Sequence, residues 1–437
     1  MMKIETGKGT ISPITLIAVW STSLVVNLPG LAITPILGNV EAVFPHTSEL
    51  EVQMLTILPN LFIIPFVLLS GKLSVSKSKI SILSFALVIY LLSGIAYFFA
   101  HSMTQLIVIS CVLGIGCGLV IPIAAGLIAD YFTGKYRMKQ LGIKSGIANM
   151  ALVAATFVVG WLAKENWRLP FIVYMTPLIP LLLTPFLWKK HHEETVARTD
   201  SGTPSTHPNR YRDSVDRATA TASPISVIAA SPAEYAAPPP PKGKIEWGKL
   251  GGAMALYGIT TYAVTVVAYY LPFLASQYHI DDSQVGTITA VFFIAIMTPG
   301  FILPYIVKGL KNKTIPAALL SMFLGLLAGC AAGSQWMFGI SAFLLGFGYG
   351  VVQPIVYDKA VECSSGQQST LALSLVLAMN YTAVTIAPFV VDFFKWIFSA
   401  QGNLFPYILN SVITGVFLLL SVLLTRKFIF SVNEEYT

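Results

Sequence analysis

Charged residues and cysteines are scarce in this sequence. Of its 437 residues, 11% are charged and 55% are hydrophobic, and the mean hydropathy is +0.73. Soluble domains carry roughly 25% charged residues, so this composition excludes a soluble globular protein. The four cysteines lie in or beside apolar runs, without metal-ligand spacing. They therefore indicate neither a disulfide framework nor a zinc site.

Motifs that carry chemistry are also missing. The chain has no G-x-x-x-x-G-K-[ST] phosphate loop, so it lacks the usual signature of an ATPase. We find no nucleophile–base pair and no metal-ligand cluster, and we expect neither an enzyme nor a cofactor. The net charge of +7 lies in short loops between apolar runs, which argues against nucleic acid as a partner.

Long apolar runs fill most of the chain. They last about 20 residues or more, the length at which a helix crosses a hydrocarbon core about 30 Å thick. Strands that cross a membrane would alternate over about 10 residues instead. The sequence therefore predicts an all-α membrane protein with twelve transmembrane helices. The predicted helices cover about residues 13–37, 51–72, 79–99, 104–128, 140–163, 169–188, 250–274, 284–307, 314–333, 337–358, 368–392 and 403–425. The first run is too long for a cleavable signal.

The polar stretch in the middle divides the chain into an amino-terminal half at 1–189 and a carboxy-terminal half at 246–437. Residues 190–245 are rich in Ser, Thr, Ala and Pro, a composition that cannot bury a core. We expect a disordered cytoplasmic linker that lets the two halves rock. The alternative is a loop that regulates the protein or binds a partner.

The two halves repeat one another. LGIGCGLVIPIAAGLIAD at 113–130 returns as LGFGYGVVQPIVYDKAVE at 345–362, with three glycines, a proline and a final acid at equal positions. Internal repeats of this kind are typical of secondary transporters. We expect the glycines to allow close helix packing, and Pro122 and Pro354 to bend their helices.

Lys and Arg placement sets the predicted orientation. With the amino terminus inside, all of the 27 Lys and Arg residues fall in inner loops except Lys164, Arg168 and Lys395. This is the excess that the positive-inside rule demands. We therefore expect a multi-pass protein of the cell membrane, inner or plasma, with both termini cytoplasmic.

Twelve helices in two halves around a long inner loop resemble the major facilitator superfamily. Gly71 resembles the first residue of the family's G-x-L-x-D loop, although Val75 stands where the family has Asp. Trp167, Arg168 and Phe171 resemble its W-R-x-x-F motif. The resemblance implies two six-helix halves, alternating access and a monomer. It also implies contacts between the halves at the inner helix ends. The gating candidates are Gly71, Lys77, Asp130, Arg137, Lys311 and Glu362.

One subfamily, the drug–proton antiporters, carries a G-P pair in its fifth helix. Ala155 and Thr156 stand where that pair would be, and Ser110 stands where many members have an Arg in the fourth helix. The resemblance to the superfamily thus extends over nearly the whole chain, while the subfamily stays open.

Several polar side chains lie inside the predicted helices, where polar groups are costly and often functional. They offer hydrogen-bond donors and acceptors to a substrate, and the alternative is that each bonds a neighbouring helix. The candidates for substrate binding are Asn27, Asn60, Asn149, Tyr262, Gln353, Tyr357 and Asn380.

Asp358 is the acid predicted to lie deepest in a helix. Partial desolvation would allow such a carboxyl group to exchange a proton, which makes it the candidate for proton coupling. The alternative is an ion pair at the inner membrane surface, with Lys359 or with a cation of an inner loop.

The predicted cavity is poor in charge, which favours a neutral, lipophilic or weakly charged solute. We expect a small-molecule substrate, exported in exchange for protons by a chain embedded in a lipid bilayer. An uptake permease or facilitator for a small organic metabolite is the first alternative. A membrane sensor or interaction protein is an alternative of another class.

The predicted orientation has a direct test. Reporters fused after Lys190 and after Thr437 should both report the cytoplasm, because both positions follow an even number of predicted helices. Paired alkaline phosphatase and fluorescent-protein fusions measure this, and an external signal at either position contradicts the orientation.

Overall fold

The computed structural model describes residues 3–30, 32–33, 36–44, 47, 49–187, 244–280, 282–365, 368–400 and 402–432. Most of the linker expected at 190–245 lies outside these residues. The described residues on either side of that gap belong to one compact unit of helices.

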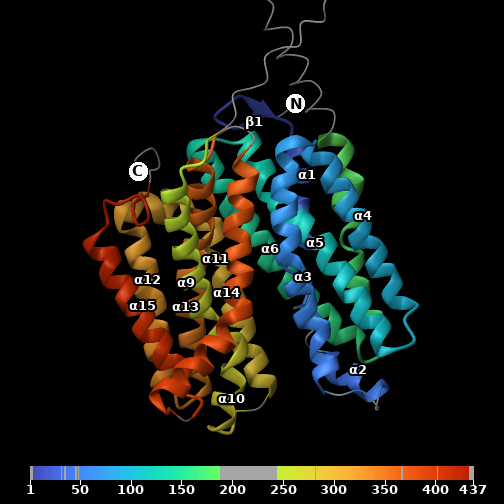
Figure 1. Ribbon diagram of the computed structural model, residues 1–437, viewed down its shortest axis with the longest axis vertical. Coiled ribbons are helices and arrows are strands. Elements are labelled where there is room, and N and C mark those ends of the chain that lie inside the picture. The colour runs from blue at the N-terminus through green and yellow to red at the C-terminus, as the bar shows by residue number, and fades with distance from the viewer. Residues whose placement is uncertain are drawn as a thin grey trace, which may run out of the picture. The chain divides into compact units, whose positions relative to one another are not determined.

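The helices agree with the predicted order of segments (Figure 1). Ten stretches are long and apolar enough to cross a membrane, and one of them, Gln284–Cys330, contains two helices joined by the short η4 (Lys311–Lys313). A shorter apolar helix at Pro13–Val25 completes the twelve segments. The helices with the long spans are α3 (Glu49–Ser76), α4 (Lys79–Phe98), α5 (Met103–Tyr131), α6 (Gly134–Leu162), α9 (Trp247–Tyr269), α11 (Asp282–Leu310), α12 (Thr314–Cys330), α13 (Gln335–Glu362), α14 (Ser369–Phe398) and α15 (Phe405–Leu423). The span at Leu169–Leu187 opens with η3 (Leu169–Met175).

The first segment is shorter than the helix predicted at 13–37. It consists of α1 (Pro13–Ser21) and η1 (Thr22–Val25), and α2 (Leu37–Val43) follows only after a stretch of turns. Pro29 disfavours a helical conformation at the residue before it. Gly30 has a φ of 76°, in the left-handed region that glycine tolerates best. The seventh segment is divided into α9 and α10 (Leu271–Ser276), and Pro272 lies in the first turn of α10. Proline lacks a backbone N–H and its ring clashes with the carbonyl four residues earlier, so it starts a helix well but interrupts a continuous one.

The tenth segment is longer than predicted. We expected it to end at about residue 358, whereas α13 continues to Glu362. Asp358 and Lys359 are therefore part of a helix, where they are 1% and 3% exposed. This placement brings two charged side chains into the packed interior at one end of the bundle.

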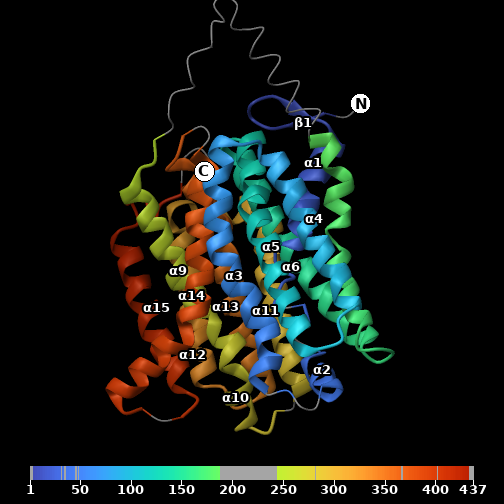
Figure 2. The same cartoon turned by 45° about the vertical axis from the view of Figure 1, so that its right-hand side comes forward.

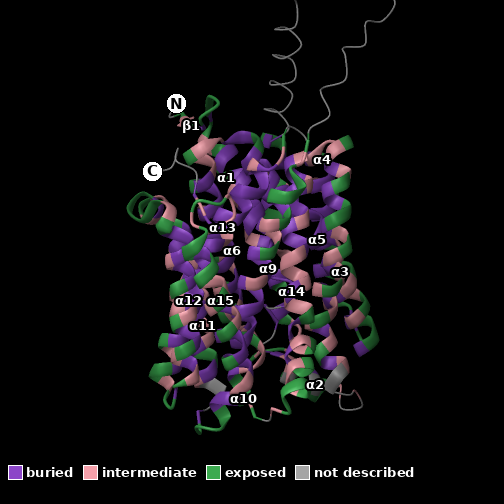
Figure 3. Ribbon diagram, turned by 60° about the vertical axis from the view of Figure 1, so that its left-hand side comes forward, coloured by how far each residue is buried: buried purple, intermediate pink, exposed green. Residues whose placement is uncertain are grey.

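The distribution of buried and exposed residues is the one expected of a helical bundle in a membrane. Residues buried inside the bundle line the inward faces of the helices, and exposed residues lie on the outer faces and at the ends (Figure 3). Many exposed residues on the outer faces are large and apolar, such as Phe85, Phe389 and Leu423. Apolar side chains on a helix that spans a bilayer face lipid at no cost.

The two halves pack on each other mainly through two helix pairs, α3 with α14 and α6 with α11 (Figure 2), and α5 with α14 and α6 with α13 add further contacts. Glycines allow the closest approaches. A Cβ atom placed on Gly142 of α6 would lie 2.6 Å from the carbonyl oxygen of Gly300 in α11, and one placed on Gly71 of α3 would overlap Ser374 of α14. Gly71 and Gly142 lie near the helix ends that face β1 (Ile4–Glu5) and the described carboxy-terminal residues (Figure 1). The halves are thus tightly joined at this end, which we call the terminal end.

The close approach of α6 and α11 predicts the effect of a single methyl group. Gly142→Ala should lower the stability of the protein by about 1–3 kcal/mol, because a backbone carbonyl cannot move aside cheaply. Gly160→Ala is the matched control in the same helix, since a Cβ atom there would meet nothing within 4 Å. It should stabilise the helix by roughly 0.5–1 kcal/mol. Thermal unfolding of the purified protein in detergent measures both, and equal effects would contradict the packing.

Candidate functional site

A cluster of hydrogen-bonded side chains lies near the middle of the carboxy-terminal helices. The amide oxygen of Asn380 in α14 accepts hydrogen bonds from Thr261 of α9 at 2.8 Å and from the Tyr349 hydroxyl of α13 at 2.9 Å. The Tyr257 and Tyr357 hydroxyl groups lie 2.8 Å apart. The rings of Tyr257 and Tyr349 stack with centroids 6.0 Å apart. These side chains tie α9, α13 and α14 together at a depth where lipid offers no hydrogen bonds.

The amino-terminal half brings its own polar groups to a similar depth. Asn27 donates to the Asn149 amide oxygen at 3.3 Å, and Asn149 donates to the Ser145 carbonyl of α6 at 2.9 Å. The Ser145 hydroxyl donates across the interface to Gln353 of α13. Gln353 in turn donates to the Tyr257 hydroxyl at 3.0 Å. A continuous polar path therefore crosses from one half to the other near the centre of the bundle.

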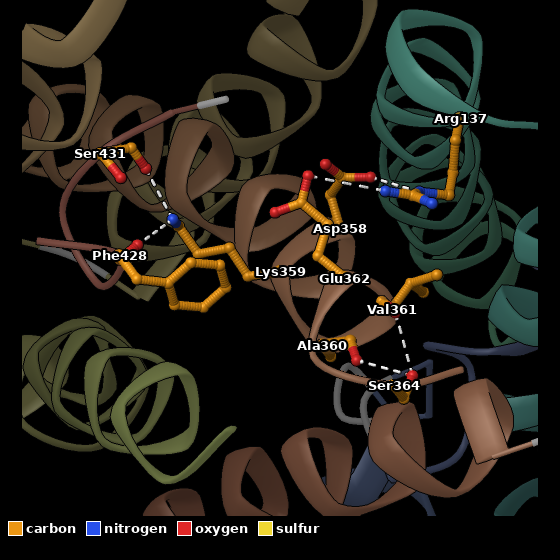
Figure 4. A network of polar contacts seen from close by, with 9 residues as sticks. All are labelled: Arg137, Asp358, Lys359, Ala360, Val361, Glu362, Ser364, Phe428 and Ser431. Atoms are coloured by element: carbon orange, nitrogen blue, oxygen red, sulfur yellow. Dashed lines mark hydrogen bonds and ion pairs between the residues drawn. The ribbon is translucent and has the colours of Figure 1, made fainter. Parts of the chain in front are cut away.

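An ion pair joins the halves closer to the terminal end. Arg137 Nε of α6 lies 2.5 Å from Asp358 Oδ1 of α13, and its Nη2 lies 3.8 Å from Glu362 Oε1 (Figure 4). The side chains of Arg137 and Asp358 are 11% and 1% exposed. A charged hydrogen bond that is shielded from water is strong, and breaking it leaves an uncompensated buried charge.

Of the two alternative partners expected for Asp358, Lys359 points the other way, and Arg137, counted with the inner loops, is the cation that forms the ion pair (Figure 4). The Lys359 ammonium group donates to the carbonyl oxygens of Phe428 and Ser431 and lies 4.4 Å from the centroid of the Phe428 ring. The chain after α15 therefore folds back over the end of α13. We call residues 426–432 the carboxy-terminal tail.

The amino-terminal hairpin occupies the corresponding place in the other half. It consists of β1 and β2 (Thr10–Ile11), and it packs on the corner between α5 and α6. The Tyr136 hydroxyl donates to Glu5 at 2.7 Å, and the Thr133 amide donates to the Thr6 carbonyl at 3.0 Å. The hairpin thus fixes the residue that precedes Arg137.

The start of the second half is also bound to the end of α13. The Glu246 amide donates to the Cys363 carbonyl at 2.8 Å, and the Lys244 amide donates to the Ser365 hydroxyl at 2.9 Å. Lys244 and Ile245, which we assigned to the linker, are thus in contact with α13. Burial, reinforced by the Glu246 and Glu362 carboxylates, raises the pKa of the Cys363 thiol to about 11, so this thiol is protonated at neutral pH.

Other candidate residues are not part of the polar path. Asn60 donates to the Thr56 carbonyl of its own helix at 3.1 Å. Tyr262 is 8% exposed and packs among apolar residues, and its hydroxyl has no partner in the described part of the chain. Pro122 and Pro354 lie inside α5 and α13, and both helices continue through them.

The remaining gating candidates are scattered over the terminal end. Asp130 forms an ion pair with Lys79 at 2.7 Å, which ties it to its own half rather than to the other one. Asp130 also presents its carbonyl to Lys8 at 3.1 Å. Lys77 and Lys311 are exposed. Of the predicted set, Gly71, Arg137 and Glu362 contact the opposite half.

Sequence reasoning missed Lys144, which we counted with the inner loops although the helix predicted at 140–163 contains it. It lies within α6 and is 2% exposed, with its ammonium group 5.3 Å from the centroid of the Tyr357 ring. The start of α6 holds several basic residues, and this run resembles a loop. Gly142 and Gly146, four residues apart on either side of Lys144, were the available signal for a packed helix face.

The family model described as Major Facilitator Superfamily matches residues 12–252 and 250–430. The chain belongs to the major facilitator superfamily. As a member of this superfamily it is a multi-pass membrane transporter and not an enzyme. The prediction of two six-helix halves is confirmed.

Curated relatives in the superfamily match parts of the chain. A stretch of 159 residues is 28% identical to the multidrug transporter protein MdtP of Bacillus subtilis (strain 168), covering 36% of this chain and 28% of MdtP. A stretch of 131 residues is 30% identical to a protein of Cupriavidus pinatubonensis named "Probable 4-methylmuconolactone transporter", covering 29% and 30%. A stretch of 114 residues is 27% identical to the quinolone resistance protein NorA of Staphylococcus aureus, covering 26% and 29%. The chain therefore spans less than a third of the length of each of these relatives.

Solved structures of the superfamily share the fold over almost the full length. A structure of XylE with two introduced tryptophans has a TM-score of 0.71 at 15% identity, covering 96% of each chain. The human organic anion transporter MFSD10 has a TM-score of 0.67 at 15% identity, covering 94% of this chain and 100% of that one. At this identity the likeness shows the fold alone.

The ion pair between the halves predicts a strong energetic coupling. Arg137→Gln or Asp358→Asn alone should cost about 3–5 kcal/mol of stability, because each leaves a buried charge without its partner. The double variant should cost clearly less than the sum. Thermal unfolding in detergent measures this double-mutant cycle.

The control is the pair of Lys79 and Asp130, in which Asp130 is 39% exposed. Its coupling should stay within about 1 kcal/mol, since water screens an exposed pair. Equal coupling in the two cycles would show that Arg137 and Asp358 do not hold the halves together.

Proposed function

We propose that this superfamily member is a secondary transporter that exports hydrophobic or weakly charged small molecules in exchange for protons. One observation carries the proposal. Polar side chains of both halves meet near mid-helix, while an ion pair closes the halves at the terminal end. A site at mid-depth between two halves that are joined at one end fits alternating access.

The arrangement supplies the parts that alternating access needs. Gln353 and Asn149 present amide groups that can both donate and accept hydrogen bonds, and Tyr257 and Tyr357 add aromatic faces. A substrate bound among them would replace contacts between the halves and favour their separation. The direction that we assign, export, is supported by similarity to MdtP and NorA, whose names specify a multidrug transporter and quinolone resistance.

Asp358 is the group that we assign to proton coupling. A proton bound by its carboxylate would cancel the attraction of Arg137 and release α13 from α6. Glu362, also of α13 and 3.8 Å from Arg137, would then be the remaining charged partner of Arg137 across this interface. The terminal end is cytoplasmic in this proposal, as the distribution of Lys and Arg indicates.

Uptake of a small organic metabolite is the second candidate function. The likeness to a protein named for 4-methylmuconolactone favours it. The same two-state architecture serves either direction, since the direction follows from the gradients and not from the fold.

Dye accumulation in cells that express the protein tests the proposal. The wild type should lower the cellular content of a lipophilic, weakly acidic fluorescent dye, and a protonophore should abolish the difference. Asp358→Asn should fail to export even after its transport is normalised to its membrane abundance, because an amide cannot carry the coupling proton. Glu165→Gln, which also removes one carboxylate but from an exposed position, should export like the wild type.

Each part of the proposal has an outcome that contradicts it. Unchanged dye content in wild-type cells contradicts export, and labelled-metabolite uptake is then the next measurement. Export that persists in Asp358→Asn with undiminished sensitivity to the protonophore removes Asp358 from coupling and leaves it as a structural ion pair.

A further inference from the structure

The two deeply buried lysines of the bundle are in different electrostatic situations. Lys359 is 3% exposed, and two carbonyl oxygens accept its hydrogen bonds. Lys144 is 2% exposed, and the contact described for its ammonium group is the ring of Tyr357 at 5.3 Å. No carboxylate of the described residues forms an ion pair with Lys144. A buried cation normally has a paired anion, because burial of an isolated charge is costly.

The position of Lys144 excludes two ordinary explanations. It follows the start of α6 by ten residues, about 15 Å at 1.5 Å per residue, so its ammonium group is not at the end of the helix. A lysine on the lipid face would extend its chain toward the headgroups. Lys144 instead contacts Tyr357, a residue of the opposite half.

The surroundings of Lys144 belong to the polar path between the halves. The next residue, Ser145, donates to Gln353. Tyr381 of α14 interacts electrostatically with Tyr357 of α13 and with Cys117 of α5, which places it among helices of both halves. An ammonium group, an amide and two phenol rings from three helices therefore converge on this one region.

We infer that Lys144 is the counter-charge for the substrate and that the substrate is an organic monoanion, a monocarboxylate with an apolar or aromatic body. This inference rests on the proposed transport function and narrows its substrate class. The carboxylate binds the Lys144 ammonium group, Gln353 donates a hydrogen bond, and the apolar body packs on the Tyr357 and Tyr381 rings.

The same geometry argues against a substrate with more negative charge. Arg137 is the next cation toward the terminal end, and Asp358 already binds it at 2.5 Å. Lys359 is bound to the carboxy-terminal tail. One uncompensated cation in the path matches one negative charge. Lys144 of α6 therefore adds a single positive charge to a cavity that we expected to be poor in charge.

Binding to the purified full-length protein tests the inference without a transport assay. Benzoate, benzamide and benzylamine share a ring and differ in charge, and octanoate keeps the carboxylate on an alkyl chain. The midpoint of thermal unfolding should rise saturably with benzoate or octanoate. At equal concentration, benzamide and benzylamine should bind at least ten-fold more weakly than the better carboxylate. If neither carboxylate shifts the midpoint, the inference is overturned.

Variants of Lys144 separate a ligand-binding role from a structural one. Lys144→Gln should weaken carboxylate binding at least ten-fold, and Lys144→Arg should retain most of it. Without ligand, Lys144→Gln should unfold at the same or a higher temperature than the wild type, since it removes an unpaired buried charge. Lys164→Gln, which removes an exposed lysine beyond the end of α6, should bind like the wild type.

The outcomes distinguish this inference from the proposed function. A lower melting point of ligand-free Lys144→Gln, or carboxylate binding that survives this substitution, overturns the inference whatever the dye assay shows. Carboxylate binding that depends on Lys144 supports it even if cells export no dye, in which case only the direction or coupling of transport has failed.

Discussion

The ion pair between Arg137 and Asp358 is the interaction on which the arrangement of the halves depends. It joins helices from the two halves of the chain, and its carboxylate is almost completely buried. Attraction between charges grows as water is excluded, while the cost of removing one partner grows with it. The pair therefore forms only when α6 and α13 are in register and close together. The glycine contacts between α6 and α11 make that approach possible, because a side chain at Gly142 would meet backbone.

From this pair toward the middle of the bundle, the polar side chains form successive layers. Lys144 and Tyr357 come next, then Ser145 with Gln353, and then the cluster that includes Tyr349 and Asn380. Most donors and acceptors in these layers are satisfied within the protein, which buried polar groups require. Lys144 is different because its charge is not matched. The neutral groups of the site already have hydrogen-bond partners, while one cation has no anion beside it. We therefore expect the site to distinguish substrates mainly by their charge and less by their shape.

The sequence was sufficient to predict the order of the helices and the division of the chain into two repeated halves. Apolar run length and the repeat of 113–130 at 345–362 are local signals, and bilayer thickness turns them into helices. The sequence was less informative about where helices end, because local signals conflict there. The apolar run at 13–37 looked continuous, although Pro29 and Gly30 end its helical conformation.

The site was predictable only in part, because its contacts join distant parts of the chain. Gln353, Asn149 and Asn380 were recognisable as amides inside apolar segments, and the structure brings them into one polar path. The partner of Asp358 was recognisable only as Lys359 or a cation of an inner loop, since nothing local relates Asp358 to Arg137 in particular. Lys144 was misplaced for a different reason. The basic start of α6 has the composition of a loop, and only packing against the other half makes it a buried helix face.

The amino-terminal hairpin and the carboxy-terminal tail give the chain ends a mechanical role. The hairpin holds the residue before Arg137 through Glu5 and Thr6, and the tail holds the residue after Asp358 through Phe428 and Ser431. A force that pulls on the hairpin therefore reaches Arg137, and a force that pulls on the tail reaches Asp358. In the alternating access that we propose, a fusion tag or a binding protein anchored beside the hairpin or the tail would shift the balance between the joined and the separated halves. The placement of an affinity tag is consequently a functional choice for this protein, and a spacer between tag and tail preserves its native balance.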